Sequence, residues 1–329
     1  NRIFLGGNIG KPLLPEIETI SPDDVCVVEL SSFQLISMRQ SPDVAVVTNL
    51  APNHLDVHKD MDKYSEVIAD SRAGVVDENA RKAWRILFND IYTAPVPGQN
   101  PLMNMRPSMY RGTDPFDSKA RYHYDNGKLK EAVSLLLDSR GAGASFEFDV
   151  TNLTRQWLSN TFDSLYFDYC GAYAAKEFGK MASDEKKMLG ILDDIDRLLS
   201  TQSYFLLGKW LSDARGWGAD PVEADYFETN ARNILTSWGD RGSYLTDYAN
   251  RTISGLVSSY YKGRWELFFN SVNKAVSESG EFGGAENEAY QDEVRDFEGR
   301  WWKERVGSFP SKPVGNSRKV ARYQSFCFL

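Results

Sequence analysis

The chain has 329 residues, of which 42% are hydrophobic and 26% charged, which excludes a disordered or collagen-like protein and predicts two globular domains. Its 38 basic and 46 acidic residues give a net charge of −8, which argues against a nucleic-acid-binding protein. No apolar run approaches the about 18 residues that a membrane-spanning helix needs, and three cysteines are too few for a disulfide framework.

The N-terminal part predicts a short α/β fragment. Residues 25–30 and 44–48 are β-branched runs without alternation, which is typical of parallel strands that are buried on both faces. The segment between them is long enough for a crossover between parallel neighbours. Gly6, Gly7 and Gly10 predict a loop ahead of the first strand.

The remainder of the chain predicts helices. Residues 78–92 place Ala83, Ile86, Leu87 and Ile91 on one face at helical spacing. Further helices are predicted at residues 128–139, 150–180, 185–200, 205–215, 222–237, 247–277, 286–306 and 318–326. The predicted fold is therefore mainly α, a multi-helix array preceded by a short α/β fragment with parallel strands.

Tryptophan and tyrosine are concentrated in the helical part. Most of these side chains are expected to pack in the core. Trp217 and Trp238 lie beside glycines in predicted loops, which makes them better candidates for stacking on a ligand ring.

One acid and one histidine follow the predicted strands. Glu29 ends the first strand and His54 comes after the second, and the carboxyl ends of parallel strands face the ligand crevice. The two side chains could share a divalent cation beside a phosphate, or form a purely structural pair. The glycines ahead of Lys11 do not form a phosphate loop, because their spacing is too short and Pro12 follows the lysine.

Residues 1–64 resemble the central domain of Mur ligases, in particular the UDP-N-acetylmuramoyl-alanine–D-glutamate ligases. The resemblance is carried by residues 5–10, 29–35, 48–49 and 53–56. It implies that Glu29 and His54 hold Mg²⁺ and that Asn8 and Ser31 lie by the muramoyl substrate or its phosphates. Ile68 stands where the family has a carbamylated lysine, and the ATP phosphate loop and the C-terminal domain of the family are missing. ATP-dependent ligation is therefore kept only as an alternative function.

Residues 65–329 are similar to the C-terminal part of family-89 glycoside hydrolases, the α-N-acetylglucosaminidases. The similarity is carried by residues 83–84, 90–92, 106–108, 149–156, 205–211, 228–232, 238–239, 247–250, 255–256 and 260–265. In that family this region is an all-helical domain that packs against a catalytic (β/α)8 barrel and supplies aromatic walls to the pocket for terminal N-acetylglucosamine. The resemblance implies that Trp238, Tyr248, Asn230 and Arg232 contact the substrate, that Arg264 supports the fold, and that no cofactor is needed.

The two catalytic carboxylates of these glycosidases lie on the barrel, and the Mur-like fragment occupies that place in this chain. No catalytic residue is therefore assigned, and we expect the chain alone to be inactive. Acidic pairs such as Asp193 and Asp194 are expected on solvated helix faces. The expected partner is the terminal N-acetylglucosamine of a glycan. We also expect self-association through the uncovered barrel-facing surface.

The two fragments join near residues 63–72 without a Gly, Ser or Pro linker. Such a join predicts a chimera of truncated domains, since a natural fusion normally respects domain edges. The location is left open, because Mur ligases are cytoplasmic and these glycosidases are exported or lysosomal. The chain has no initiator Met, so we expect it to start within a longer protein. A third hypothesis for the function is a non-catalytic, helical domain that binds sugar.

Overall fold

The computed structural model describes residues 2–7, 11–31, 34, 38, 40, 42–44, 61–94, 101–109 and 123–327. The chain divides into an N-terminal unit, Asn1–Asn53, and a helical unit, His54–Leu329. Both classes of structure that the sequence predicts are present, a short parallel sheet at the N-terminus and a large helical array after it.

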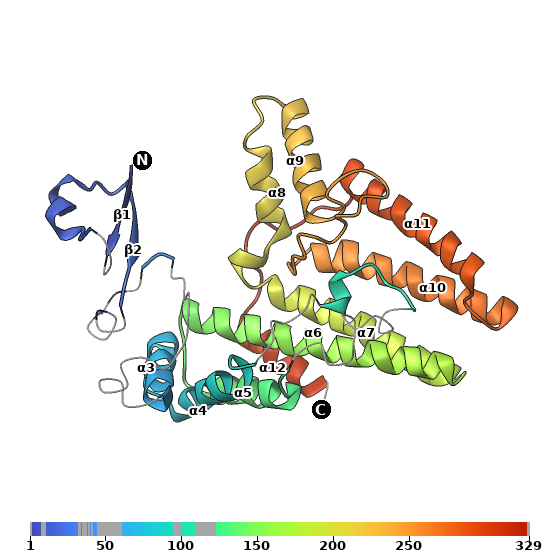
Figure 1. The fold of residues 1–329 in the computed structure, drawn as a ribbon, viewed down its shortest axis with the longest axis horizontal. Helices are drawn as coiled ribbons and strands as arrows, with labels where there is room; N and C mark the ends of the chain where they lie inside the picture. Colours follow the sequence, from blue (N-terminus) through green and yellow to red (C-terminus); the bar gives the residue numbers. More distant parts are fainter. Residues whose placement is uncertain are drawn as a thin grey trace. The chain divides into compact units, whose positions relative to one another are not determined.

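The N-terminal unit holds a two-stranded parallel sheet, β1 (Ile3–Gly7) and β2 (Val25–Glu29) (Figure 1). A 3-10 helix, η1 (Leu14–Thr19), separates the strands in the chain. The strand predicted at 25–30 is confirmed. Gly6 and Gly7 lie in β1, so the loop predicted for them is wrong.

A close approach of backbones explains the two glycines of β1. A Cβ atom on Gly6 would collide with the backbone of Lys11, and one on Gly7 would collide with the backbone of Glu29. Glycine is therefore needed for these close approaches, and Gly7 also has a φ of 140°, which residues with side chains rarely adopt. Gly10 and nearly all of the strand predicted at 44–48 lie outside the described residues.

The strands of the N-terminal unit are formed, but they are not buried. Every residue of β2 is exposed, and Leu5 of β1 is 72% exposed. The expectation of strands buried on both faces is therefore not met within this unit. The reason is that parallel strands need further strands and covering helices to be buried.

The described part of the helical unit consists of helices joined by loops. The α-helices are α3 (Met61–Ala73), α4 (Glu78–Ile86), α5 (Asn126–Asp138), α6 (Ala144–Ala174), α7 (Phe178–Leu199), α8 (Leu207–Arg215), α9 (Pro221–Leu235), α10 (Lys262–Ser279), α11 (Gly284–Lys303) and α12 (Ser317–Cys327). Short π-helical turns, η2 (Leu87–Ile91) and η6 (Val257–Tyr261), continue α4 and precede α10, and 3-10 turns lie at η3 (Leu102–Asn104) and η5 (Ser203–Phe205).

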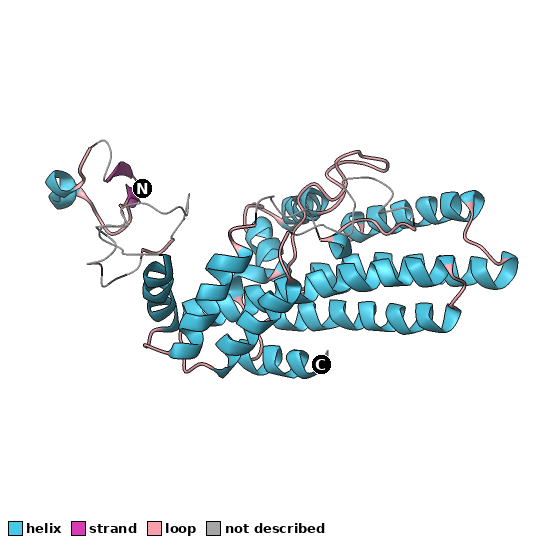
Figure 2. Ribbon diagram, turned by 60° about the horizontal axis from the view of Figure 1, so that its bottom comes forward, coloured by secondary structure: helices cyan, strands magenta, loops and turns pink. Residues whose placement is uncertain are grey.

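The helices are arranged around the long pair α6 and α7. Helices α3 and α5 contact α6, α4 packs on α3 and α5, and α12 lies against α6 and α7 (Figures 1 and 2). The hairpin of α10 and α11 contacts α7 through α10, and the hairpin of α8 and α9 contacts α11 through α9. Among the described residues, no helix combines the length and apolar character needed to cross a membrane.

Aromatic side chains form the centre of the core. Phe162 and Tyr166 lie one turn apart on α6, and both rings contact the fully buried indole of Trp265 on α10. Phe268 and Phe269, one turn further along α10, extend the cluster. Such edge-to-face contacts add to the hydrophobic effect of burying large rings. The expectation that most aromatic residues pack in the core is confirmed for this cluster.

Several of the observed helices differ from the predicted ones. The helix predicted at 150–180 is interrupted after α6, because Lys176 adopts a left-handed φ of 58°. The helix predicted at 247–277 begins only with η6, and the residues before it form a loop. Helix α3 was not predicted, because its buried face consists of Ser65, Ala69 and Ala73, whose small side chains give little hydrophobic periodicity.

Candidate functional site

The loop between α9 and η6 presents exposed aromatic rings, and two of them are in contact. Trp238 is 38% exposed and Tyr248 is 68% exposed. Their ring centroids are 5.3 Å apart and their planes meet at 79°, an edge-to-face contact. We call these two rings the aromatic pair. Large rings with an apolar face and a polar edge are suited to contact a ligand ring at a surface.

The backbone of this loop is strained at three residues that are not glycine. Trp238, Asp247 and Asn250 adopt left-handed φ values of 47°, 67° and 44°. Each such residue costs about 1–2 kcal/mol, and the strain persists only where the surroundings fix the backbone. Residues of this kind cluster at ligand-binding sites. The loop is therefore the part of the helical unit whose backbone departs most from ordinary geometry.

Hydrogen bonds from α9 hold the first half of the loop. The amide of Trp238 donates to the carbonyl oxygen of Asn233 at 2.8 Å. The side chain of Asn233 donates in turn to the carbonyl oxygen of Gly239 at 2.8 Å. The amide of Asp247 donates to the carbonyl oxygen of Thr236 at 3.0 Å, which closes the loop at its base. The orientation of the Trp238 backbone is thus fixed from both sides.

A buried ion-pair cluster holds the second half of the loop. Arg264 of α10 donates from Nη1 to the two carboxylate oxygens of Asp247 at 2.9 and 3.1 Å. The same nitrogen donates to Glu298 of α11 at 3.0 Å, and Arg106 donates to Glu298 at 2.5 and 3.0 Å. The backbone amide of Arg106 also donates to Asp247 at 2.9 Å. Asp247, the residue before Tyr248, is therefore bound to Arg264 on α10, to the backbone of Arg106 and, through its own amide, to Thr236 after α9.

The two acids of this cluster respond differently to their surroundings. Burial raises the pKa of Asp247, and the nearby charge of Arg264 offsets this only in part. Burial also disfavours ionisation of Glu298, but the hydrogen bond from Arg106 and the charge of Arg264 outweigh it, so its pKa lies below the usual value. Arg264 is completely buried, as expected for a residue that supports the fold.

The other two residues predicted to contact the sugar are placed differently. Asn230 is exposed on α9. Arg232 is 1% exposed and donates to Glu228 at 2.9 Å and to the carbonyl oxygen of Val306 at 2.8 Å. Its guanidinium lies 4.8 Å above the ring of Trp301. In the described part of the chain no contact joins Arg232 to the aromatic pair, so its role toward a substrate stays a prediction.

Only part of the magnesium and substrate site predicted for the N-terminal unit lies within the described residues. Glu29 is the exposed last residue of β2, and the amide and hydroxyl of Ser31 donate to Oε1 of Gln34 at 2.8 and 3.1 Å. Asn8 and His54 lie outside the described residues. Within the described ranges no group of three metal-ligating side chains occurs.

Sequence reasoning did not identify the cluster that holds the loop. Asp247 and Arg106 lie in segments that carry the glycosidase resemblance, but nothing in the sequence pairs them, because they are far apart in the chain. Glu298 gave no signal, since an acid in a charged helix normally faces solvent. A pattern of residue types also does not predict that an aspartate has a left-handed backbone.

The fold and the loop define an all-helical domain that presents a rigidly held aromatic pair. The chain belongs to the family of alpha-N-acetylglucosaminidase (NAGLU) C-terminal domains, whose family model matches residues 64–324. A second model, the Mur ligase middle domain, matches residues 14–74. Both resemblances inferred from the sequence are thereby confirmed. The two matches overlap at 64–74, mostly within α3.

Curated relatives match each part separately. Human alpha-N-acetylglucosaminidase is 34% identical over 216 residues, which cover 63% of this chain and 28% of the human protein. The UDP-N-acetylmuramoylalanine–D-glutamate ligase of Clostridium kluyveri is 64% identical over 61 residues, which cover 18% of this chain and 13% of the ligase. The chain thus spans less than a third of the length of either relative.

Solved structures share the fold of the helical array. A family 89 glycoside hydrolase from Clostridium perfringens, in complex with its substrate GlcNAc-alpha-1,4-galactose, matches with a TM-score of 0.67 and 24% identity over 80% of this chain and 31% of that chain. The complex of a family 89 enzyme from the same organism with 2-acetamido-1,2-dideoxynojirmycin matches with a TM-score of 0.66 and 21% identity over 98% of this chain and 39% of that chain.

Proposed function

We propose that this chain is the C-terminal helical part of an α-N-acetylglucosaminidase, and that the aromatic pair contacts the terminal N-acetylglucosamine of a glycan. The observation that carries the proposal is that Trp238 and Tyr248 form an exposed edge-to-face pair on a strained loop fixed by a buried ion-pair cluster. A binding surface with a fixed backbone loses little conformational entropy when a sugar is bound. The substrate class is supported by the family to which the chain belongs.

The same geometry supports a binding role without turnover by this chain alone. Hydrolysis of a glycoside needs two carboxyl groups that flank the scissile bond, one to transfer a proton and one to attack or to activate water. Of the acids that hold the loop, Glu298 is buried and Asp247 is half-buried, and both are paired with Arg264 and Arg106. We therefore expect no hydrolysis of an aryl α-N-acetylglucosaminide by the purified chain. Turnover that is lost on replacement of one acid would contradict this.

The binding proposal is tested by titrating the full chain with N-acetylglucosamine, followed by ligand-observed NMR. Trp238→Ala and Tyr248→Ala are expected to weaken binding about three- to tenfold, since an aromatic contact contributes about 0.5–1.5 kcal/mol. Trp217→Ala is the matched control. Trp217 is also a loop-borne indole beside glycines and 80% exposed, but it has no aromatic neighbour in the described part of the chain. Equal effects of the three substitutions would contradict the proposal.

For the N-terminal unit, magnesium binding by Glu29 and His54 is a proposal that rests on the Mur-ligase likeness. The described residues supply one oxygen ligand of this pair, Glu29 at the carboxyl end of β2, and do not by themselves form a complete magnesium site. No ligation step is therefore assigned to the chain. A Mg²⁺ titration that Glu29→Gln leaves unchanged would contradict a metal-binding role.

A further inference from the structure

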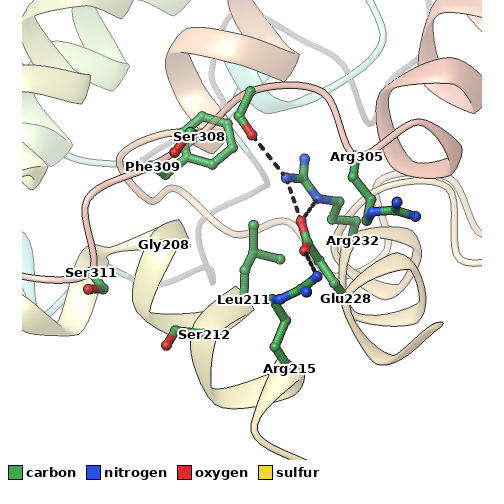
Figure 3. Close-up of a pocket in the computed structure, with 11 residues that line it drawn as sticks. Gly208, Leu211, Ser212, Arg215, Glu228, Arg232, Arg305, Ser308, Phe309 and Ser311 are labelled. Atoms are coloured by element: carbon green, nitrogen blue, oxygen red, sulfur yellow. Dashed lines mark hydrogen bonds and ion pairs between the residues drawn. The ribbon is translucent and has the colours of Figure 1, made fainter. Parts of the chain in front are cut away.

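A cavity of about 480 Å³ lies between α8, α9 and the segment that follows α11 (Figure 3). It is lined by Gly208, Leu211, Ser212, Arg215, Glu228, Arg232, Arg305, Gly307, Ser308, Phe309 and Ser311. Three of these residues are arginines and one is an acid, so the wall carries a net positive charge. The cavity is lined by neither member of the aromatic pair.

Two of the arginines share their acidic partners. Nη1 of Arg215 lies 2.6 Å from Asp225 and 2.8 Å from Glu228. Nη2 of Arg305 lies 3.1 Å from the other oxygen of Asp225. In the described part of the chain, Nε and Nη2 of Arg215 and Nε and Nη1 of Arg305 have no hydrogen-bond partner. Each side chain is more than a third exposed, so these donors are accessible.

The third arginine forms a fixed wall of the cavity. Arg232 is buried and pairs with Glu228 at 2.8 Å, while its remaining donors reach the carbonyl oxygens of Val306 and Gly307. Glu228 is thus shared by Arg215 and Arg232, and Asp225 by Arg215 and Arg305. Three guanidinium groups face two carboxylates, and one positive charge is left without a counterion within this group.

The lining of the cavity includes residues with unusual backbone geometry on the side of the C-terminal segment. Arg305 has a left-handed φ of 51°, and Gly307 follows with a φ of 85°. Across the cavity, a Cβ atom on Gly208 would collide with the carbonyl groups of Phe309 and Pro310, so only glycine allows this approach. The hydroxyl groups of Ser212, Ser308 and Ser311 add small polar groups to the lining.

We propose that this cavity binds an oxyanion: a phosphate, sulfate or carboxylate group, held by Arg215 and Arg305. Guanidinium groups present planar pairs of N–H donors that match the oxygens of such anions and remain charged at any physiological pH. An anion here would supply the counterion that the two shared acids do not. The proposal rests on Arg215 and Arg305 and does not involve the aromatic pair.

The test is a calorimetric or NMR titration of the full chain with sodium phosphate, sodium sulfate and sodium acetate at constant ionic strength set by chloride. We expect saturable binding of at least one of the three anions, and their order of affinity identifies the group. Arg305→Gln is expected to weaken binding about tenfold, equivalent to about 1.4 kcal/mol. Arg241→Gln is the matched control, because Arg241 is an exposed arginine paired with Asp292 and Asp296 outside the cavity.

A second variant separates loss of binding from loss of structure. Ser308→Asp leaves every ion pair of the cavity in place and adds a negative charge to its lining, so it is expected to weaken anion binding at least as much as Arg305→Gln. Circular dichroism checks that each variant keeps its helical content. Absence of saturable binding, an equal loss in Arg241→Gln, or unchanged binding in folded Ser308→Asp would each overturn the proposal.

Discussion

Leu198 in α7 is fully buried, whereas Leu5 in β1 is 72% exposed. The N-terminal unit is matched by a relative at 64% identity and the helical unit by one at 34%. The part with the higher identity therefore has the poorer core. The strand sequence of β2 suits a sheet covered on both faces, but the matched segment represents only 13% of the ligase. Secondary structure can be set by a local sequence, while burial depends on the surrounding domain.

The two units can be compared experimentally because their probes differ. The eight tryptophans of the chain all lie between Trp84 and Trp302, so tryptophan fluorescence reports on the helical unit. Hydrogen exchange of the amides in β1 and β2 reports on the N-terminal unit.

The largest difference in stability between the two units is expected when glutamate is replaced by glutamine at a buried ion pair of one and at an exposed ion pair of the other. Glu298→Gln removes the partner of Arg106 and Arg264 and is expected to lower the free energy of unfolding by about 4 kcal/mol. Glu16→Gln removes the half-buried partner of the exposed Lys11 and is expected to leave the exchange of β1 unchanged. Urea unfolding followed by fluorescence measures the first effect.

The pH dependence of the stability of Glu298→Gln tests whether the ionised carboxylate of Glu298 causes this effect. Because the pKa of Glu298 is lowered in the folded chain, the unfolded state binds more protons as the pH falls toward the usual glutamate value. The interaction of Glu298 therefore stabilises the fold above that value and is lost below it. Glu298→Gln should therefore lose less stability than the unmodified chain as the pH falls below about 4.5. Identical slopes would show that Glu298 is not ionised in the fold.

A smaller difference is expected for the hydrophobic residues. Leu198→Ala leaves a cavity in the core between helices and is expected to cost about 3 kcal/mol in urea unfolding. Leu5→Ala removes a side chain that is already solvated, so the exchange rates of β1 and β2 should stay the same. Faster exchange in Leu5→Ala would mean that the sheet of the N-terminal unit is covered in solution, and the contrast between the units would fail.

The smallest effect concerns a single helix end. Asp220 caps α9, and its carboxylate accepts from the amides of Val222 and Glu223 at 2.8 and 2.9 Å. Asp220→Ala is expected to lower the unfolding free energy of the helical unit by about 1 kcal/mol. Asp220→Asn keeps an acceptor at the same position and should stay close to the unmodified chain. An equal loss in both variants would point to the charge of Asp220 and not to its cap.

The sequence was sufficient for features that repeat along a helix, and insufficient for contacts between distant segments. The apolar face of 78–92 predicted α4 and η2, with Ala83 and Leu87 fully buried. The sequence predicts Tyr248 within the helix at residues 247–277. In the structure Tyr248 lies in the loop. The residue before it, Asp247, has a left-handed backbone and is paired with Arg264. The pairing of Arg215 with Asp225 and Glu228 likewise follows from the packing of α8 on α9.

The strained backbone of Trp238 predicts which residues directed evolution would select at this position. At a φ of 47° a glycine would relieve strain of about 1–2 kcal/mol, so a library selected only for folding should accumulate glycine or asparagine there. A library selected for the proposed binding of N-acetylglucosamine should instead retain an aromatic ring. The difference between the two sets of survivors would show how much stability the position gives up in return for its side chain.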